Sequence, residues 1–205
     1  MKIKNLVDNT TSFLFKRLSE LIGLSTLCLS ILLLASLISY SPEDPNFIFP
    51  ENTEIKNLLG AKGSYVSDIL YQSIGLISLL IPISFFFISL SIIIDKKILY
   101  IIESLFFIII YSIIGTLFFT VFHTETYWLT INGNNGFIGN LFTESFFVNL
   151  INLNYQISYI VLIFLISLFF LLSINFKFRY LKFLLTIFSK SKKISTKRVV
   201  ESIDD

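Results

Sequence analysis

The sequence predicts an all-α integral membrane protein with four transmembrane helices, both termini in the cytoplasm and a short interfacial helix before the fourth span. Hydrophobic residues make up 54% of the 205 residues and charged residues only 15%, whereas about a quarter of a soluble domain is charged. The apolar residues also gather in uncharged runs of 22, 26, 19 and 32 residues, which follow Glu20, Asp68, Glu103 and Glu144.

Each run is long enough to cross a bilayer as a helix, because about 20 apolar residues span the hydrocarbon core. Backbone groups in that core must bond within their own segment, and the runs lack the alternation of a membrane β-strand. The predicted spans are 21–40, 69–94, 98–122 and 157–174. A secretory signal peptide is the alternative for the first span, but its apolar part exceeds the usual length of about 7–15 residues.

The charges between the spans predict their orientation. With both termini inside, 14 of the 16 Lys and Arg residues are cytoplasmic, and only Lys56 and Lys62 are outside. The positive-inside rule favours this topology. The chain then divides into a cytoplasmic tail (1–18), a membrane domain (19–175) and a basic cytoplasmic tail or linker start (176–205). We expect that last segment to attract anionic lipid rather than to contact nucleic acid directly.

Small residues on the predicted spans indicate where helices approach closely. We take Gly75, Pro82 and Gly115 as candidate packing residues. Pro82 lies near the middle of its span and removes one backbone hydrogen bond, so we expect a local kink there. The small-residue stripes are Ser19, Gly23, Thr26 and Ser30; Tyr71, Gly75, Ser78 and Pro82; and Ser104, Ser112, Gly115 and Thr116.

Glu103 is the one carboxylate inside a predicted span, and an acid within the membrane is a candidate functional residue. It lies about 8 Å from the start of its span, at about 1.5 Å per residue, so its side chain could also reach back toward Lys96 and Lys97. A small four-helix transporter or channel is therefore the alternative function. Its polar lining would be Glu103, Tyr111, Ser78 and Ser112.

The segment before the fourth span has two features. His123 stands near Glu125, Tyr127 and Trp128, a group typical of the aromatic belt at a membrane surface; a metal site or a membrane enzyme would need further ligands. Gly133, Gly136 and Gly139 predict a tight turn and then the interfacial helix. In that helix Ile138, Leu141, Phe142 and Phe146 would enter lipid, and Asn140, Thr143 and Glu144 would face water.

Evidence for catalysis is missing from the sequence. It contains one Cys, Cys28, and therefore no intrachain disulfide. Phosphate-loop, nucleophile-turn and zinc-helix motifs do not occur in it. We therefore expect neither a catalytic residue nor a cofactor nor a metal.

The segment after the first span reads Ser39–Tyr40–Ser41–Pro42–Glu43–Asp44–Pro45–Asn46–Phe47. It resembles the Ser-Tyr-Ser-Pro-x-Asp-Pro-x-aromatic segment of FtsK-type (FtsK/SpoIIIE) bacterial DNA translocases. Phe47 stands where Trp is common, and the end of the second span lacks the family's Arg-rich exit. Further matching positions are Asn57, Gly60, Gly63, Asp68, Gly75, Pro82 and the pair Gly136-x-x-Gly139.

The resemblance implies the N-terminal membrane domain of such a translocase. In that family the domain anchors a hexameric ATP-driven motor at the division septum of the inner membrane, where the motor moves chromosome ends during chromosome partition. We therefore expect a multi-pass membrane anchor and assembly domain, not an enzyme, whose partners are the lipid bilayer, division-site membrane proteins and other copies of the chain. The candidate partner-contact or structural residues are Ser41, Pro42, Asp44, Pro45 and Phe47. Pro42 and Pro45 each fix a backbone angle, and Asp44 can bond nearby amides.

Overall fold

The computed structural model describes residues 2–45, 54–123, 128–129 and 131–175, with the side chains of 2–9 left out. No strand occurs among these residues. The elements are α1 (Lys2–Ile38), α2 (Gly60–Ile74), the 3₁₀-helix η1 (Gly75–Leu79), α3 (Leu80–Asp95), α4 (Tyr100–Phe122), α5 (Gly136–Phe142), α6 (Phe146–Leu153) and α7 (Tyr155–Ser173).

Within the described residues, four helical segments are long and apolar enough to cross a membrane: Thr10–Ile38, Gly60–Asp95, Tyr100–Phe122 and Tyr155–Ser173. This confirms the predicted number of spans. Three of them begin earlier than predicted, the fourth by only two residues. α1 runs back through the expected tail because residues 2–20 contain no Gly or Pro to end a helix, and the second span includes all of α2.

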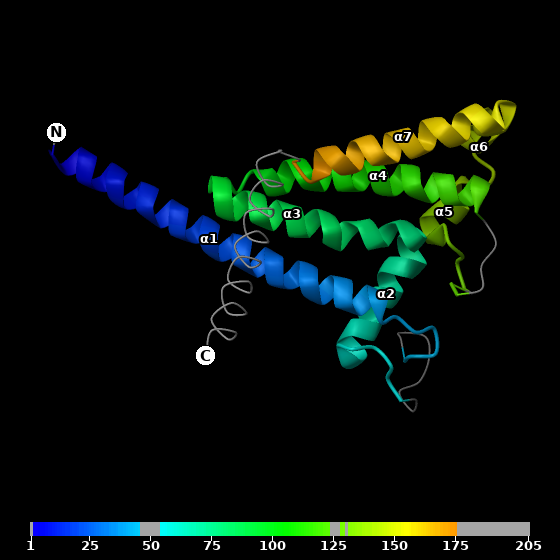
Figure 1. Cartoon of the computed structure of the whole chain (residues 1–205), viewed down its shortest axis with the longest axis horizontal. Coiled ribbons are helices and arrows are strands. Elements are labelled where there is room, and N and C mark those ends of the chain that lie inside the picture. Colours follow the sequence, from blue (N-terminus) through cyan, green and yellow to red (C-terminus); the bar gives the residue numbers. More distant parts are fainter. Residues whose placement is uncertain (1, 46–53, 124–127, 130, 176–205) are drawn as a thin grey trace, which may run out of the picture. The chain divides into compact units, whose positions relative to one another are not determined.

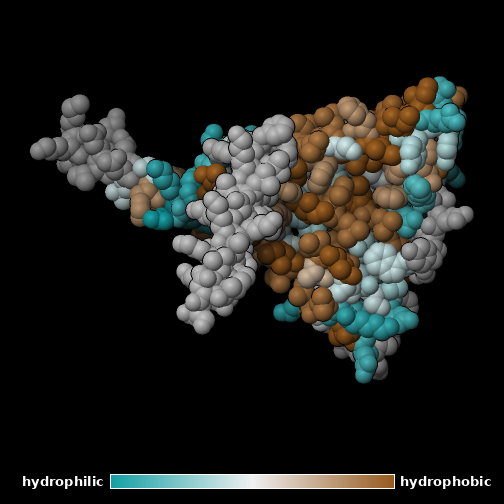
Figure 2. Space-filling view, viewed as in Figure 1, coloured by the Kyte–Doolittle hydropathy of each residue, from teal (hydrophilic) through white to brown (hydrophobic). Residues whose placement is uncertain are grey.

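The long helices α1, α3, α4 and α7 lie side by side in that order (Figure 1), and α2 crosses the end of α1 before the chain turns into η1 and α3. α1 packs mainly on α3, and α7 mainly on α4. Apolar residues cover the middle of the helices, and hydrophilic residues gather toward their ends (Figure 2). This pattern suits side chains that face lipid along their length and water at their ends.

The contacts between the helices use close approaches and buried hydroxyl groups. A Cβ atom on Gly23 of α1 would lie 2.7 Å from Cγ1 of Ile93 on α3. On α4, a Cβ atom on Gly115 would clash with Ile77 of η1, which supports the choice of Gly115 as a packing residue. Deeper in, Ser84 Oγ of α3 lies 3.2 Å from Tyr111 Oη of α4 and 2.9 Å from Ser173 Oγ of α7. These hydroxyl groups join three helices.

The irregular turn in the second span comes before Pro82 rather than at it. The α-helix breaks at Gly75, whose φ is +69°, and continues as η1. Pro82 is the third residue of α3. In the first turn of a helix the backbone N–H groups have no partner within that helix, so a proline there costs little.

Two short helices, α5 and α6, stand where one was predicted. Ser145 is extended, with φ −79° and ψ 156°, and it separates them. Leu141 and Phe146 are 66% and 72% exposed, and the predicted water-facing residues Asn140, Thr143 and Glu144 are exposed as well. Their interfacial position in a membrane stays a prediction.

Candidate functional site

The chain turns sharply where α1 ends. Proline disfavours the α conformation in the residue before it, so Pro42 prevents the helix from extending through Ser41. The Asp44 amide donates to the Ser41 carbonyl at 3.2 Å and closes a turn with Pro42 at its second position, where proline is favoured. Pro42 and Glu43 are exposed, whereas Asp44 and Pro45 are buried.

Asp44 binds the chain segment that leads into α2. Its carboxylate is only 2% exposed. Oδ1 accepts the backbone N–H of Lys56 and Oδ2 accepts that of Asn57, each at 2.8 Å. The prediction that Asp44 bonds amides is confirmed, but the amides are 12 and 13 residues later in the chain rather than adjacent. A buried carboxylate that accepts two amides is a strong, charge-assisted clamp.

Asn57 connects the same segment to both helices. Its Nδ2 donates to the Ser36 carbonyl of α1 at 2.9 Å, and Ser36 Oγ donates to the Gly63 carbonyl of α2 at 2.6 Å. Gly63 must be glycine, because a Cβ atom there would clash with the Asn57 amide. Ser64 Oγ donates to the Pro45 carbonyl at 2.9 Å. We call these residues the Asp44 network: Ser36, Asp44, Pro45, Asn57, Gly63 and Ser64.

An aromatic cluster lies beside this network. Tyr40 Oη donates to Asp68 Oδ1 at 3.2 Å, and Tyr71 Oη donates to the Leu37 carbonyl at 3.0 Å. The rings of Tyr40 and Tyr71 are 4.9 Å apart, and the Trp128 ring lies 5.5 and 5.1 Å from them. Burial, together with the negative charge of Asp68, raises the pKa of Tyr40 to about 12. Trp128 therefore packs against the ends of α1 and α2, and its place in an aromatic belt at a membrane surface stays a prediction.

The exposed side of the turn carries an ion pair between Glu43 and Lys56. Lys56 lowers the pKa of the Glu43 carboxyl, and Glu43 raises the pKa of the Lys56 ammonium. Of the predicted contact residues, Asp44 and Pro45 are buried and hold the turn in place, whereas Pro42 is exposed and available to a partner. Ser41 is half-buried. Phe47 lies outside the described residues.

The break at Gly75 is a docking point for the loop before α5. The Leu76 amide donates to the Asn134 carbonyl at 2.9 Å, and Asn132 Nδ2 donates to the Gln72 carbonyl at 3.2 Å. Gly75 has no room for a side chain, because a Cβ atom would clash with the Asn134 carbonyl. Gly75 was predicted as a helix-packing residue, and its actual contact is backbone on backbone.

Glu103 lies inside the candidate span Tyr100–Phe122, and its depth in a membrane stays a prediction. It is exposed on the first turn of α4, since that helix begins at Tyr100. A carboxylate is favourable near a helix N-terminus. The predicted reach toward Lys96 is not seen, because the Lys96 ammonium lies 2.7 Å from Glu20 on α1. Lys97 Nζ lies 5.9 Å from the centre of the Tyr100 ring.

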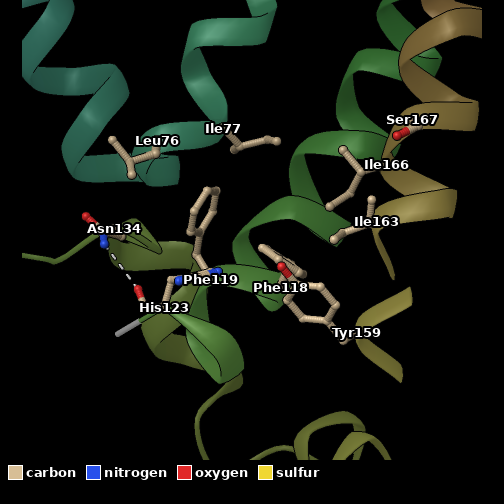
Figure 3. A pocket seen from close by; sticks show the side chains of 10 residues that line it. All are labelled: Leu76, Ile77, Phe118, Phe119, His123, Asn134, Tyr159, Ile163, Ile166 and Ser167. Carbon is tan, nitrogen blue, oxygen red and sulfur yellow. Dashed lines mark hydrogen bonds between the residues drawn. The ribbon is translucent and has the colours of Figure 1, made fainter. Parts of the chain in front are cut away.

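The structure does not assemble the polar lining predicted for a transporter. Tyr111, Ser78 and Ser112 are buried between helices, away from Glu103 on its exposed turn. A cavity of about 460 Å³ does open between η1, α4 and α7 (Figure 3), but none of those residues lines it. Its walls are mostly apolar side chains, among them Phe118 and Phe119.

His123 lies at one end of this cavity and is exposed. Its carbonyl accepts Asn134 Nδ2 at 3.1 Å (Figure 3). Glu125 and Tyr127, the other residues of its predicted group, lie outside the described residues. Within the described part of the chain, no three His, Cys, Asp or Glu side chains gather as a metal site.

The sequence pattern did not predict the contacts of Ser36, Ser64 and Asn134. Ser36 and Ser64 are serines in apolar helices, and their bonds join segments 27 and 19 residues apart. The signal for Asn134 was the Asn-rich, Gly-rich loop itself, which was interpreted only as a turn.

Comparisons with known proteins agree with this architecture. A family model described as the 4TM region of DNA translocase FtsK/SpoIIIE matches residues 15–187. The DNA translocase FtsK of Rickettsia bellii (strain RML369-C) is 41% identical over 66 residues, which are 32% of this chain and 8% of that protein. The DNA translocases FtsK of Rickettsia typhi (strain ATCC VR-144 / Wilmington) and Rickettsia prowazekii (strain Madrid E) are each 44% identical over 50 residues, 24% of this chain and 7% of theirs. The matched segment thus spans less than a tenth of these relatives. No solved structure matches the chain significantly.

Proposed function

This chain belongs to the family described as the 4TM region of DNA translocase FtsK/SpoIIIE, and from that membership we propose that it is the membrane anchor and septal assembly domain of a bacterial cell-division DNA translocase. In this proposal the chain holds the translocase in the inner membrane at the septum during chromosome segregation. The observation that carries the proposal is the overlap between the matched residues, 15–187, and the four membrane-spanning helices.

The proposed topology has both termini in the cytoplasm, which the distribution of Lys and Arg supports. Single cysteines test it in a Cys28→Ser background. Glu43→Cys and Lys97→Cys both replace exposed side chains, at opposite ends of the spans. A membrane-impermeant maleimide added to intact spheroplasts should label the cysteine at position 43 and spare the one at position 97; the reverse pattern would invert the topology.

The proposed partners are division-site membrane proteins and other copies of the chain. Support comes from the turn after α1, where the buried Asp44 carboxylate fixes the backbone and Pro42 is exposed. A rigid, exposed turn loses little conformational entropy when a partner binds.

A fluorescent fusion of the whole chain in dividing cells tests the assembly role. We expect a band at midcell in constricting cells. An even signal around the membrane would contradict septal assembly while leaving the anchor role intact, and a signal in the cytosol would contradict both.

A further inference from the structure

A groove of about 300 Å³ lies between the last turns of α1 and the first turns of α2. α1 contributes Leu29, Leu32 and Leu33, and α2 with its preceding residue contributes Leu59, Lys62 and Val66. Leu29, Leu32 and Val66 are 55%, 50% and 43% exposed, so the groove is open at the surface of the helices. Its walls belong to helices that are long and apolar enough to span a membrane.

Among the residues that the structure describes, Lys62 is the one charged side chain that lines the groove. The other side-chain polar atom, Ser36 Oγ, is turned inward and donates to the Gly63 carbonyl at 2.6 Å. Lys62 is exposed, and no ion pair joins it to any carboxylate in the described ranges. Lys56, by contrast, pairs with Glu43. The groove therefore combines hydrocarbon walls with a single cation at its edge.

The position of Lys62 favours a bound anion. It is the third residue of α2, and the partial positive charge at a helix N-terminus disfavours a cation there. An anion beside Lys62 would offset both the positive charge of the ammonium group and the partial positive charge at the N-terminus of α2. A long side chain such as Lys also extends readily toward a polar headgroup at a membrane surface.

The groove is open along the helices, and an extended acyl chain can lie against its apolar walls. The lysine at its edge favours an occupant with an anionic headgroup over a wholly apolar helix face. Water does not fill a site whose walls are hydrocarbon.

We propose that this groove binds an anionic phospholipid, with one acyl chain along Leu29, Leu32 and Val66 and the phosphate at the Lys62 ammonium. The lipid would fill the space where α2 diverges from α1, next to the Asp44 network. This inference depends on the chain spanning a membrane and does not depend on its role at the septum.

The test measures lipid bound to the purified full chain by native mass spectrometry in detergent, with phosphatidylglycerol and phosphatidylcholine as probes. Lys62→Gln should weaken phosphatidylglycerol binding about fivefold and leave phosphatidylcholine unchanged, since a basic residue near a membrane surface attracts anionic lipid by about that factor. Val66→Trp should reduce binding of both lipids because it fills the groove.

Two matched controls belong to the same experiment. Lys56→Gln removes a cation that is already paired with Glu43, and Ile69→Trp enlarges an α2 side chain that is 47% exposed and does not line the groove. Both should bind phosphatidylglycerol as the unaltered chain does. Equal losses of phosphatidylglycerol binding in Lys62→Gln and Lys56→Gln would show that only the general surface charge matters, and this would overturn the proposal.

A measurement on the unaltered chain avoids any folding defect in the variants. Phosphatidylglycerol with a photoreactive diazirine in its acyl chain should label the segments around Leu32 and Val66. Labelling spread evenly along α1, with Leu21 and Leu24 as strongly labelled as Leu32, would overturn the proposal.

Discussion

Gly75 and Gly136 pack backbone against backbone: a Cβ atom built on Gly136 would lie 2.5 Å from the Gly75 nitrogen. Both residues have positive φ, +69° and +67°. The contact joins the break in the second span to the start of α5. Any side chain at either position must therefore displace one of the two backbones.

Replacing Gly136 with Ala should destabilise the protein by more than backbone strain alone. A left-handed backbone costs a non-glycine residue about 1–2 kcal/mol, and the clash with Gly75 adds to it. Gly60→Ala is the matched control, because Gly60 has φ +65° but open space around its Cβ position. Denaturant titration of the detergent-solubilised chain by circular dichroism checks this; equal losses in the two variants would mean that the contact contributes nothing.

Asp44→Asn should loosen the connection between α1 and α2. The substitution keeps the shape of the side chain but turns an NH₂ group toward a backbone N–H donor, and it removes the charge from the hydrogen bonds. A hydrogen bond to a charged group contributes about 1.5–3 kcal/mol, and we expect a loss of that order in the free energy of unfolding. Glu43→Gln, which alters the adjacent exposed carboxylate, should change stability little. A similar effect of both substitutions would contradict the role assigned to Asp44.

Stability should decrease in alkali through Tyr40. Its pKa is raised from 10.0 to about 12 in the folded protein, first by burial and then by the charge of Asp68. The unfolded chain therefore loses this proton first, so the contribution is fully present below pH 10 and is lost as the pH rises toward 12. The pH dependence of the unfolding free energy should be shallower in Tyr40→Phe over that interval, since other tyrosines affect both proteins alike. Identical curves would show that Tyr40 titrates normally.

Glu103→Gln should leave the protein almost unchanged. The carboxylate is exposed on the first turn of α4, where its interaction with the helix end contributes at most about 1 kcal/mol. Tyr111→Phe is the informative comparison for stability, because it removes a buried hydroxyl group next to Ser84.

Ion flux into proteoliposomes should equal that of protein-free vesicles for both variants. Flux through the unaltered chain that Glu103→Gln abolishes would revive the transporter alternative.

Pro42→Ala should reduce septal recruitment without reducing the amount of protein in the membrane, because Pro42 is exposed while Asp44 holds the turn from within. Glu144→Ala, on an exposed residue after α5, serves as the control. Quantitative imaging of fluorescent fusions measures the midcell fraction. If Pro42→Ala reaches midcell as often as the control, the turn has a structural role only.

Hydropathy was sufficient to predict the four spans, because a run of about 20 apolar residues has few alternatives to a membrane helix. The same reasoning could not predict the partners of Asp44, since the Lys56 and Asn57 amides lie 12 and 13 residues after it in the chain. A sequence motif predicts hydrogen bonds between neighbouring residues, whereas the hydrogen bonds of Asp44 join it to a segment that is distant in the sequence.

Composition also did not predict where a helix begins. The sequence pattern placed Glu103 about five residues inside its span, because the uncharged residues 98–102 before it extended the apolar run. The chain turns at Lys96, which has a left-handed backbone with φ 56°, and α4 starts at Tyr100. The break at Gly75 was missed for a similar reason: a positive φ leaves no trace in hydropathy, whereas Pro82 attracts attention by its chemistry.

The docking of the loop before α5 onto the second span has a consequence for biosynthesis. Asn132 donates to Gln72, which precedes it by 60 residues. At about 5–20 residues per second, a ribosome reaches Asn132 about 3–12 s after Gln72. During those seconds the break at Gly75 has been translated but its docking loop has not, so the second span takes its final form only after the third has been made.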